Sequence, residues 1–415
     1  MNNISKLAIL GGDPVFDKSL PPYNTIGNEE ISAANEVLKT GLLSGFVASP
    51  GDEFFGGDWT KVIEQNFCDV FSVSHAITVN SATSGLHAAL QAAGVKEGDE
   101  VIVSPYSMSA SATSIVMCGA KPVFVDIEPD YFCIDVNKVK EAITKDTKAI
   151  MAVNIFGQPA HLSALLEISK KHSLTLIEDN AQAPKAKYFD TFSGTVGHMG
   201  VFSLNRHKTM QCGEGGVVVT NDQKLATRLQ MVRNHGEAVL PETDFLDGNE
   251  DIIGYNYRLT ELQAAIANPQ LKRLDQLNQH RINLANYLSE SIRKYDFITE
   301  PKIRESCTHV YYLYPMVFDE NKIGISRDLF LKAMQAEGAP LSNYVRPLPL
   351  IPLYENKFGK CQNYQIDNLP VVKELWKSKM LVTPICRPPL NETHIDKFVL
   401  AIEKVCDQLN HLRKI

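Results

Sequence analysis

The sequence has no paired-cysteine pattern. Its eight cysteines stand singly, and none has the CxxC or Cys/His spacing that a zinc site or an iron–sulfur cluster requires. A disulfide framework is not indicated either, so reduced thiols are expected. The sequence therefore predicts neither a metal centre nor a disulfide-stabilised scaffold.

Long hydrophobic runs and an excess of basic charge are absent as well. No apolar run reaches the length of about 20 residues that spans a bilayer. Residues 1–14 carry one lysine and an apolar run that Gly-Gly-Asp-Pro interrupts, so they match neither a signal peptide nor an anchor. The formal net charge of −7 argues against a nucleic-acid-binding protein. We expect a soluble, cytoplasmic protein without membrane or nucleic-acid partners.

What is present is the composition of a globular protein, with 44% hydrophobic and 21% charged residues. Between about residues 76 and 220, short apolar runs alternate with helical stretches. This alternation predicts an α/β fold with a mostly parallel sheet covered by helices on both faces. The expected strands are 75–79, 100–103, 122–126, 149–153, 175–178 and 215–220, and the expected helices are 29–40, 60–71, 84–93, 109–118 and 161–172.

The pattern changes after about residue 258. A long helical stretch covers 260–294, in which Pro269 predicts a kink, and a strand at 310–317 and a helix at 395–411 follow. A chain of 415 residues exceeds the usual size of a single core. We therefore expect an N-terminal arm and large domain at 1–270 and a smaller α+β domain at 271–415.

Three segments combine an apolar strand with polar residues at its C-terminal end, where ligands of parallel sheets gather. Residues 79–86 (VNSATSGL) fit an anion site at a helix N-terminus, or a plain N-capped helix. Residues 176–182 (LIEDNAQ) end in two acids that suit a buried cationic ring nitrogen, or simple solvated capping. In the third segment, Lys208 lies between an apolar run and a glycine-rich turn at 213–216. This position fits either a surface lysine or a confined nucleophile for Schiff-base chemistry.

Together these segments resemble the DegT/DnrJ/EryC1/StrS sugar aminotransferase family, within the fold-type I enzymes that use pyridoxal 5′-phosphate. The resemblance runs from about residue 25 to 405 and includes 119–126, 154–159, 233–236 and 254–263. It implies a large domain with a mostly parallel sheet of the seven-stranded type and a smaller α+β C-terminal domain. It also implies a homodimer with shared active sites.

The resemblance implies roles for individual residues. Lys208 corresponds to the lysine that holds the cofactor as a Schiff base, and Asp179 to the carboxylate that pairs with the ring nitrogen. Gln182 corresponds to a residue beside the ring. Phosphate contacts correspond to Ala82, Thr83 and Ser203, with Asn256 reaching the phosphate of the neighbouring subunit.

The chain departs from the family pattern at several positions. Met108 stands where an aromatic ring usually stacks on the cofactor, as a substitute for it or as a core residue. Ala82 replaces a glycine, and Pro349 stands where a histidine often lies near the substrate. Arg346 is either a site for an anionic donor or substrate, or a surface arginine.

The resemblance implies an aminotransferase that moves an amino group from glutamate or glutamine to a keto-sugar, most readily a nucleotide-linked one. The opening LAILGGDPV at 7–15 also resembles members that act on cyclitol ketones. A sugar dehydratase would carry histidine in place of the lysine, and the spacing from Ser203 and 213–216 favours Lys208 over His207. A non-catalytic regulator is disfavoured by the intact Lys208 and Asp179, and a nicotinamide-dependent reductase by the lack of GxGxxG after the early strands.

Overall fold

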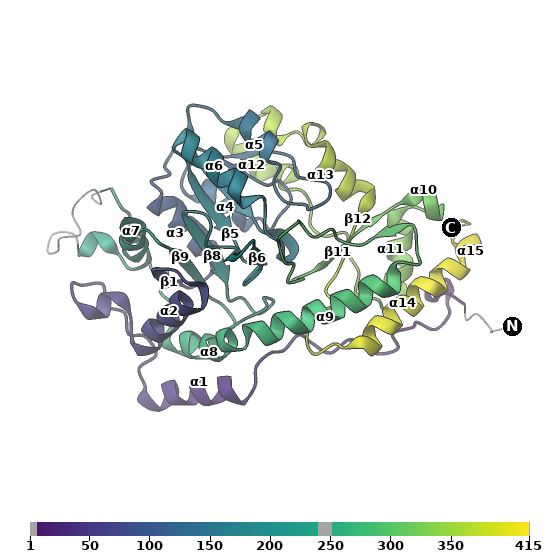
Figure 1. Cartoon of the computed structure of the whole chain (residues 1–415), viewed down its shortest axis with the longest axis horizontal. Coiled ribbons are helices and arrows are strands. Elements are labelled where there is room, and N and C mark those ends of the chain that lie inside the picture. Colours follow the sequence, from purple (N-terminus) through teal and green to yellow (C-terminus); the bar gives the residue numbers. More distant parts are fainter. Residues whose placement is uncertain (1–5, 240–250, 415) are drawn as a thin grey trace.

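A computed structural model of the chain describes residues 6–239 and 251–414 (Figure 1). Residues 1–5, part of the segment considered above for a signal peptide, lie outside the described residues. A seven-stranded sheet has the order β1-β9-β8-β5-β4-β2-β3, and only β9 runs antiparallel to its neighbours. The predicted mostly parallel sheet is therefore confirmed. Its strands are β1 (His75–Val79), β2 (Glu100–Val103), β3 (Lys121–Phe124), β4 (Thr147–Val153), β5 (Thr175–Asp179), β8 (Met199–Ser203) and β9 (Gly216–Thr220).

Helices cover both faces of this sheet, because successive strand residues point to opposite sides. In β9, Val218 packs into one hydrophobic core, whereas Val217 and Val219 pack into another with residues of α2 and α8. The helices of the first two thirds of the chain are α1 (Asn28–Thr40), α2 (Asp58–Phe71), α3 (Ala82–Ala92), α4 (Ala110–Met117), α5 (Val136–Ala142), α6 (Leu162–His172), α7 (Gln223–Arg233) and α8 (Glu261–Lys272).

The long helical stretch predicted at 260–294 is two helices, α8 and α9 (Leu274–Ile292). A capping box of Thr260 and Gln263 starts α8. Pro269 lies inside α8, and the helix ends at Arg273, whose φ of −95° and ψ of 6° leave the helical region. The expected interruption is thus present, four residues after the proline.

A second, smaller sheet lies beyond α9, which runs along the molecule toward it (Figure 1). It has the antiparallel order β10-β11-β12. Its core joins residues of α9, α11 and α14, and Leu7 and Phe16 from the N-terminal segment pack into it. The elements of this part of the chain are β10 (Ile298–Thr299), β11 (Tyr314–Phe318), α10 (Glu320–Ile323), α11 (Arg327–Ala336), α12 (Pro352–Phe358), α13 (Pro370–Glu374), β12 (Met380–Thr383), α14 (Glu392–Asp407) and α15 (Leu409–Leu412). A separate two-stranded hairpin of β6 (Lys187–Tyr188) and β7 (Thr191–Phe192) lies between β5 and β8 in the chain.

Several features are missing from the described part of the chain. No helix there has the length and apolar character needed to cross a membrane. No group of three or more His, Cys, Asp or Glu side chains is placed to hold a metal ion among those residues. All eight cysteines are free thiols.

Candidate active site

A cavity of about 350 Å³ opens at the C-terminal ends of β1, β5 and β8. The ends of these strands lie next to one another because β1 and β8 flank β9 and β8 pairs with β5. The structure therefore brings together every predicted site residue except Asn256. The cavity lining includes Ala82, Thr83, Met108, Asp179, Gln182, Ser203 and Lys208.

One end of the cavity is the first turn of α3. The Ser81 hydroxyl caps the helix by accepting from the Ser84 N–H at 3.1 Å. Within the described structure, the N–H groups of Ala82 and Thr83 have no acceptor, as is usual for the first helical turn. The Ser203 hydroxyl lines the same end. Free N–H groups and a helix dipole favour an anion here.

A glycine allows this turn to approach the sheet. A Cβ added to Gly216 in β9 would lie only 2.7 Å from the Ala82 nitrogen, closer than real contacts permit. Any larger residue at this position would push the first turn of α3 away from Ser203. The glycine-rich segment after Lys208 thus helps to shape the anion-binding end.

Asp179 is an acidic residue of the cavity lining. The carboxylate is buried at the end of β5, where it accepts hydrogen bonds from the Ser111 hydroxyl at 2.7 Å and the Ala181 N–H at 3.2 Å. Burial raises the pKa of Asp179, while the Ser111 bond and the positive charge of Lys208 act in the opposite direction. A buried carboxylate in this setting is stabilised by a cationic partner.

Lys208 lies in the turn between β8 and β9 and is half-buried. Its Nζ lies 4.3 Å from the centre of the Tyr312 ring, within the range of a cation–π contact. His207 also lines the cavity but is exposed. The Lys208 amine is therefore confined beside the Tyr312 ring, the second of the two environments that the sequence left open for this lysine.

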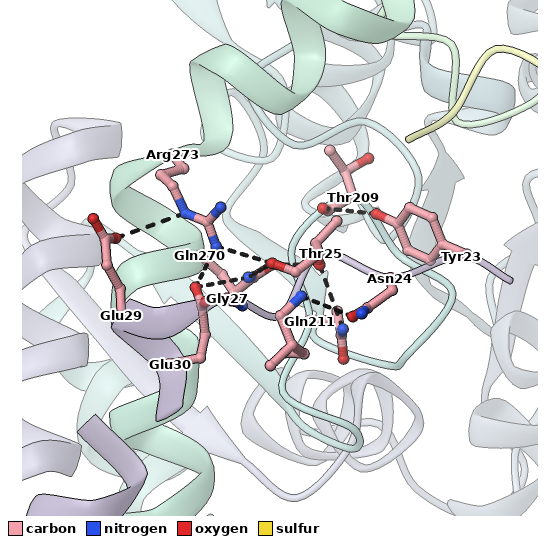
Figure 2. Close-up of polar contacts among 11 residues, drawn as sticks. Tyr23, Asn24, Thr25, Gly27, Glu29, Glu30, Thr209, Gln211, Gln270 and Arg273 are labelled. Carbon is pink, nitrogen blue, oxygen red and sulfur yellow. Dashed lines mark hydrogen bonds and ion pairs between the residues drawn. The ribbon is translucent and has the colours of Figure 1, made fainter. Parts of the chain in front are cut away.

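A polar network holds the backbone of the Lys208 turn (Figure 2). The Tyr23 hydroxyl donates to the carbonyl oxygen of Lys208 at 2.9 Å. It also donates to the carbonyl oxygen of Thr209 at 3.0 Å, the contact drawn in Figure 2. Nearby, the Gln211 amide donates to the Thr25 hydroxyl at 3.4 Å, and Thr25 donates to Gln270 of α8 at 2.8 Å. The N-terminal segment thus ties the turn to α8.

The network ends in a buried ion pair between α1 and the end of α8. Glu30 is only 1% exposed and pairs with Arg273, while the Gln270 amide donates to the same carboxylate oxygen at 2.9 Å. Although burial acts to raise the pKa of Glu30, the Gly27 N–H, Gln270 and Arg273 together lower it. Glu29 pairs with Arg273 from the exposed side at 3.7 Å.

Gln182 is fixed by two contacts from other elements. Its Oε1 accepts from the Phe156 N–H at 2.8 Å, and its Nε2 donates to the Tyr344 hydroxyl at 3.2 Å. Phe156 has a φ of 58°, in the left-handed region, which is unusual for a residue with a large side chain. Both ends of the Gln182 amide are thereby oriented at the cavity wall.

Other predicted positions lie at the rim or outside. Met108 lines the cavity but is 58% exposed, so it is not a core residue. Asn256 is exposed and lies outside the cavity of its own chain, where its Oδ1 accepts from Arg258 at 3.0 Å. Arg346 is exposed and does not line the cavity, and Pro349 is buried.

Sequence reasoning missed several residues of the site. Ser111 follows a predicted strand end in a run of hydroxyl residues at 104–114, a signal that was present but could not single out one serine. Tyr312 and Tyr344 come from the C-terminal half, and Tyr23 from the N-terminal segment. No local pattern links these three tyrosines to Lys208.

The model of the DegT/DnrJ/EryC1/StrS aminotransferase family matches residues 25–403. The chain is 33% identical to GDP-perosamine synthase of Caulobacter vibrioides, over 84% of this chain and 90% of that protein. It is 30% identical to the spore coat polysaccharide biosynthesis protein SpsC of Bacillus subtilis, over 92% of this chain and 96% of that protein. The crystal structure of an aminotransferase from Psychrobacter cryohalolentis is similar with a TM-score of 0.82 and 28% identity, covering 94% of this chain and 99% of that one. On this match and this fold, the chain belongs to the DegT/DnrJ/EryC1/StrS aminotransferase family.

Proposed function

We propose that this aminotransferase uses pyridoxal 5′-phosphate to move an amino group from glutamate or glutamine to a keto-sugar, most readily a nucleotide-linked keto-sugar. One observation carries the proposal: the amine of Lys208 and the carboxylate of Asp179 line one cavity together with an anion-binding helix turn. A ligand with an aldehyde, a cationic ring nitrogen and a phosphate has a matching group for each.

The residues of the cavity suggest how the cofactor is held. The N–H groups of Ala82 and Thr83 and the Ser203 hydroxyl would bind its phosphate. Asp179 would hold the ring nitrogen in its protonated form, since a buried carboxylate favours a cationic partner. Gln182 and Met108 would lie against the ring. Met108 replaces an aromatic residue here through contact of its polarisable sulfur.

Bound pyridoxal phosphate supplies an aldehyde that joins to amines and a ring that takes up the electron pair left when a C–H bond breaks. Lys208 has two roles. Its Nζ would hold the cofactor, and once the donor amine has taken that place, the same Nζ would carry the proton from the donor Cα to the cofactor carbon that bears the nitrogen. In the second half of the reaction, Nζ would carry a proton from that cofactor carbon to the substrate carbon that receives the amine. Tyr23 and Tyr312 keep Nζ near that carbon by holding the backbone and covering the side chain.

The keto-sugar assignment is supported by the names of two relatives. One is a GDP-perosamine synthase and the other is a spore coat polysaccharide biosynthesis protein. Both names indicate sugar chemistry in those proteins, which favours a keto-sugar over a cyclitol ketone for this chain. A single-turnover screen of the aminated cofactor against nucleotide-linked keto-sugars and inosose would decide between the two substrates.

We further propose a cytoplasmic homodimer whose subunits share their active sites. Asn256 is exposed and is not in the lining of its own cavity, as expected for a residue that serves a neighbouring subunit. An apolar group on and after α1 is also solvent-exposed in the single chain, and such patches are typical of interfaces. Its members are Ile31, Leu38, Leu42 and Leu43, each between 50 and 56% exposed.

The central test replaces Lys208. Purified wild-type protein with pyridoxal phosphate should show the absorbance band of a lysine-bound cofactor, and Lys208→Ala should lack it and lose activity by at least about 1000-fold. Lys185→Ala serves as a matched control, because that lysine pairs with Asp275 outside the cavity. A lysine-bound band that persists in Lys208→Ala would contradict the proposal.

A further inference from the structure

Two arginines flank the ring of Tyr23. Arg281 lies in α9, and Arg387 follows β12. Each guanidinium carbon lies 5.4 Å from the centre of the Tyr23 ring. Arg281 is 1% exposed and Arg387 is half-buried. Two cations from the C-terminal half thus lie near one partly buried aromatic side chain.

These cations have no counter-charge in residues 6–239 and 251–414: no carboxylate there is within ion-pair distance of either guanidinium. Nη1 of Arg281 donates to the carbonyl oxygens of Tyr311 and Tyr312, at 3.4 and 3.2 Å, but its Nε and Nη2 have no hydrogen-bond partner among the residues that the structure describes. Burial and the neighbouring charge of Arg281 lower the pKa of Arg387. Because uncompensated buried charge is costly, the pair is suited to an anion.

The arginine pair adjoins the active-site cavity. Tyr312, whose carbonyl accepts from Arg281, lines that cavity, and its ring lies 4.3 Å from Nζ of Lys208. Tyr23, between the two arginines, donates to the carbonyl of Lys208. Neither arginine is in the cavity lining itself, but Arg387 is the more exposed of the two, and its charge acts on His207, which lines the cavity.

We propose that Arg387, supported from behind by Arg281, binds the α-carboxylate of the amino donor. This assignment rests on the proposed aminotransferase function. The α-carboxylate is attached to the carbon that carries the reacting nitrogen, so it must lie close to Nζ of Lys208. The diphosphate of a nucleotide-sugar is farther from the reacting carbon, because the sugar ring separates them. A guanidinium also matches a carboxylate with two parallel hydrogen bonds.

The test measures the donor half-reaction of the holoenzyme, following the cofactor spectrum at increasing glutamate concentration. Arg387→Gln should raise the concentration for half-maximal rate by about 10- to 100-fold, the range expected for loss of a hydrogen bond to a charged group. Glutamine should show the same shift, since of the two carboxylates of glutamate it keeps only the α-carboxylate. Arg387→Lys should recover part of the loss, because lysine keeps the positive charge but cannot form the two parallel hydrogen bonds of a guanidinium.

Binding of two unreactive probes gives a readout apart from turnover. By calorimetry, Arg387→Gln should weaken glutarate binding to the holoenzyme and leave inorganic pyrophosphate binding unchanged. Arg293→Gln is the matched control, because Arg293 is 63% exposed and pairs with Glu300 at 3.1 Å. Arg346→Gln tests the exposed arginine that the sequence offered for the same role.

Three results would overturn the assignment: an unchanged glutamate dependence in Arg387→Gln and Arg387→Lys, a larger effect in Arg346→Gln, or weaker binding of pyrophosphate but not glutarate. The cofactor band separates this failure from failure of the proposed function. A wild-type protein without a lysine-bound band would contradict the function itself. A normal band with unaltered donor kinetics in the variants would contradict only the role of Arg387.

Discussion

Asp179 sits at the buried C-terminal end of β5, where a carboxylate needs compensation to stay charged. Inside this chain it receives two hydrogen bonds and the nearby charge of Lys208. The position of an acid after an apolar strand was visible in the sequence. Ser111, its hydroxyl donor, was not, because 68 residues separate the two in the chain.

Asp179→Asn should separate cofactor binding from turnover. The amide keeps the shape and can still contact Ser111, but it lacks the charge that would hold a protonated ring nitrogen. We expect the cofactor band to remain and kcat to fall by at least about 100-fold, a magnitude typical of losing one preorganised electrostatic contact. Steady-state kinetics of the loaded variant measure this, and near-normal kcat would refute the role of Asp179.

Ser111→Ala should change the pH dependence. The Ser111 hydroxyl stabilises the charged form of Asp179 and so lowers the pKa of that carboxyl against the opposing effect of burial. Its removal should raise the pKa further, so the acid limb of the kcat profile moves to higher pH. Ser114→Ala is a suitable control, because that hydroxyl donates to the Ser111 carbonyl and not to Asp179. Superimposable profiles for the wild type and Ser111→Ala would count against the assignment.

Among the elements, α1 and α8 are joined by the pair of Glu30 and Arg273 that ends the network behind Lys208. Glu30→Gln should lower the free energy of unfolding by about 2 kcal/mol at pH 7, since a buried hydrogen-bonded charge is lost. The pKa of Glu30 is lowered below its ordinary value of 4.5. Its stabilisation is therefore complete above that value and is lost as the pH falls through the folded-state pKa.

Urea unfolding at pH 7 and at successively lower pH checks this expectation. The difference in the free energy of unfolding between wild type and Glu30→Gln should become smaller at low pH. Glu29→Gln is the matched control: Glu29 pairs with the same arginine but is 67% exposed, so less than about 0.5 kcal/mol should be lost. An equal effect of both variants would show that burial does not set the strength of this pair.

Element boundaries followed local patterns closely where hydrophobic periodicity was strong. The structure begins and ends β1 and β2 where the sequence predicted. The helix at 260–294 differs, because a single periodic stretch hides the change of backbone direction at Arg273. Whether a proline ends a helix or only precedes its end depends on what packs around it.

At the scale of the whole molecule, shared active sites predict complementation between inactive variants. A Lys208→Ala subunit lacks the amine but supplies an intact Asn256 to its neighbour. An Asn256→Ala subunit keeps the amine but supplies no Asn256. After unfolding and refolding of an equal mixture, half of the dimers should be mixed, each with one complete site, giving about a quarter of wild-type activity. Light scattering checks the dimer itself. A mixture no more active than its components would place Asn256 outside the partner's site.

The division of the chain into 1–270 and 271–415 stays a prediction. Packing across this boundary is extensive, because Leu348, Tyr354 and Met380 join the core of the large sheet, and Leu7 joins that of the small one. Such contacts between distant segments cannot be read from hydrophobic periodicity, which reports only how one element faces its neighbours.

The sequence by itself determined most strands of the large sheet, their mostly parallel arrangement, the strand-end position of Asp179 and the position of Lys208 between an apolar run and a glycine-rich turn, because these depend on local periodicity and on the geometry of parallel strands. Only the tertiary structure decided which distant residues complete the site. Tyr23, Arg281 and Arg387 meet beside the Lys208 turn through the packing of the N-terminal segment, α9 and the loop after β12. Side chains from segments this far apart are brought together by the burial of apolar surface, which is non-directional, so the hydrophobic pattern of one element does not specify which distant segment packs against it.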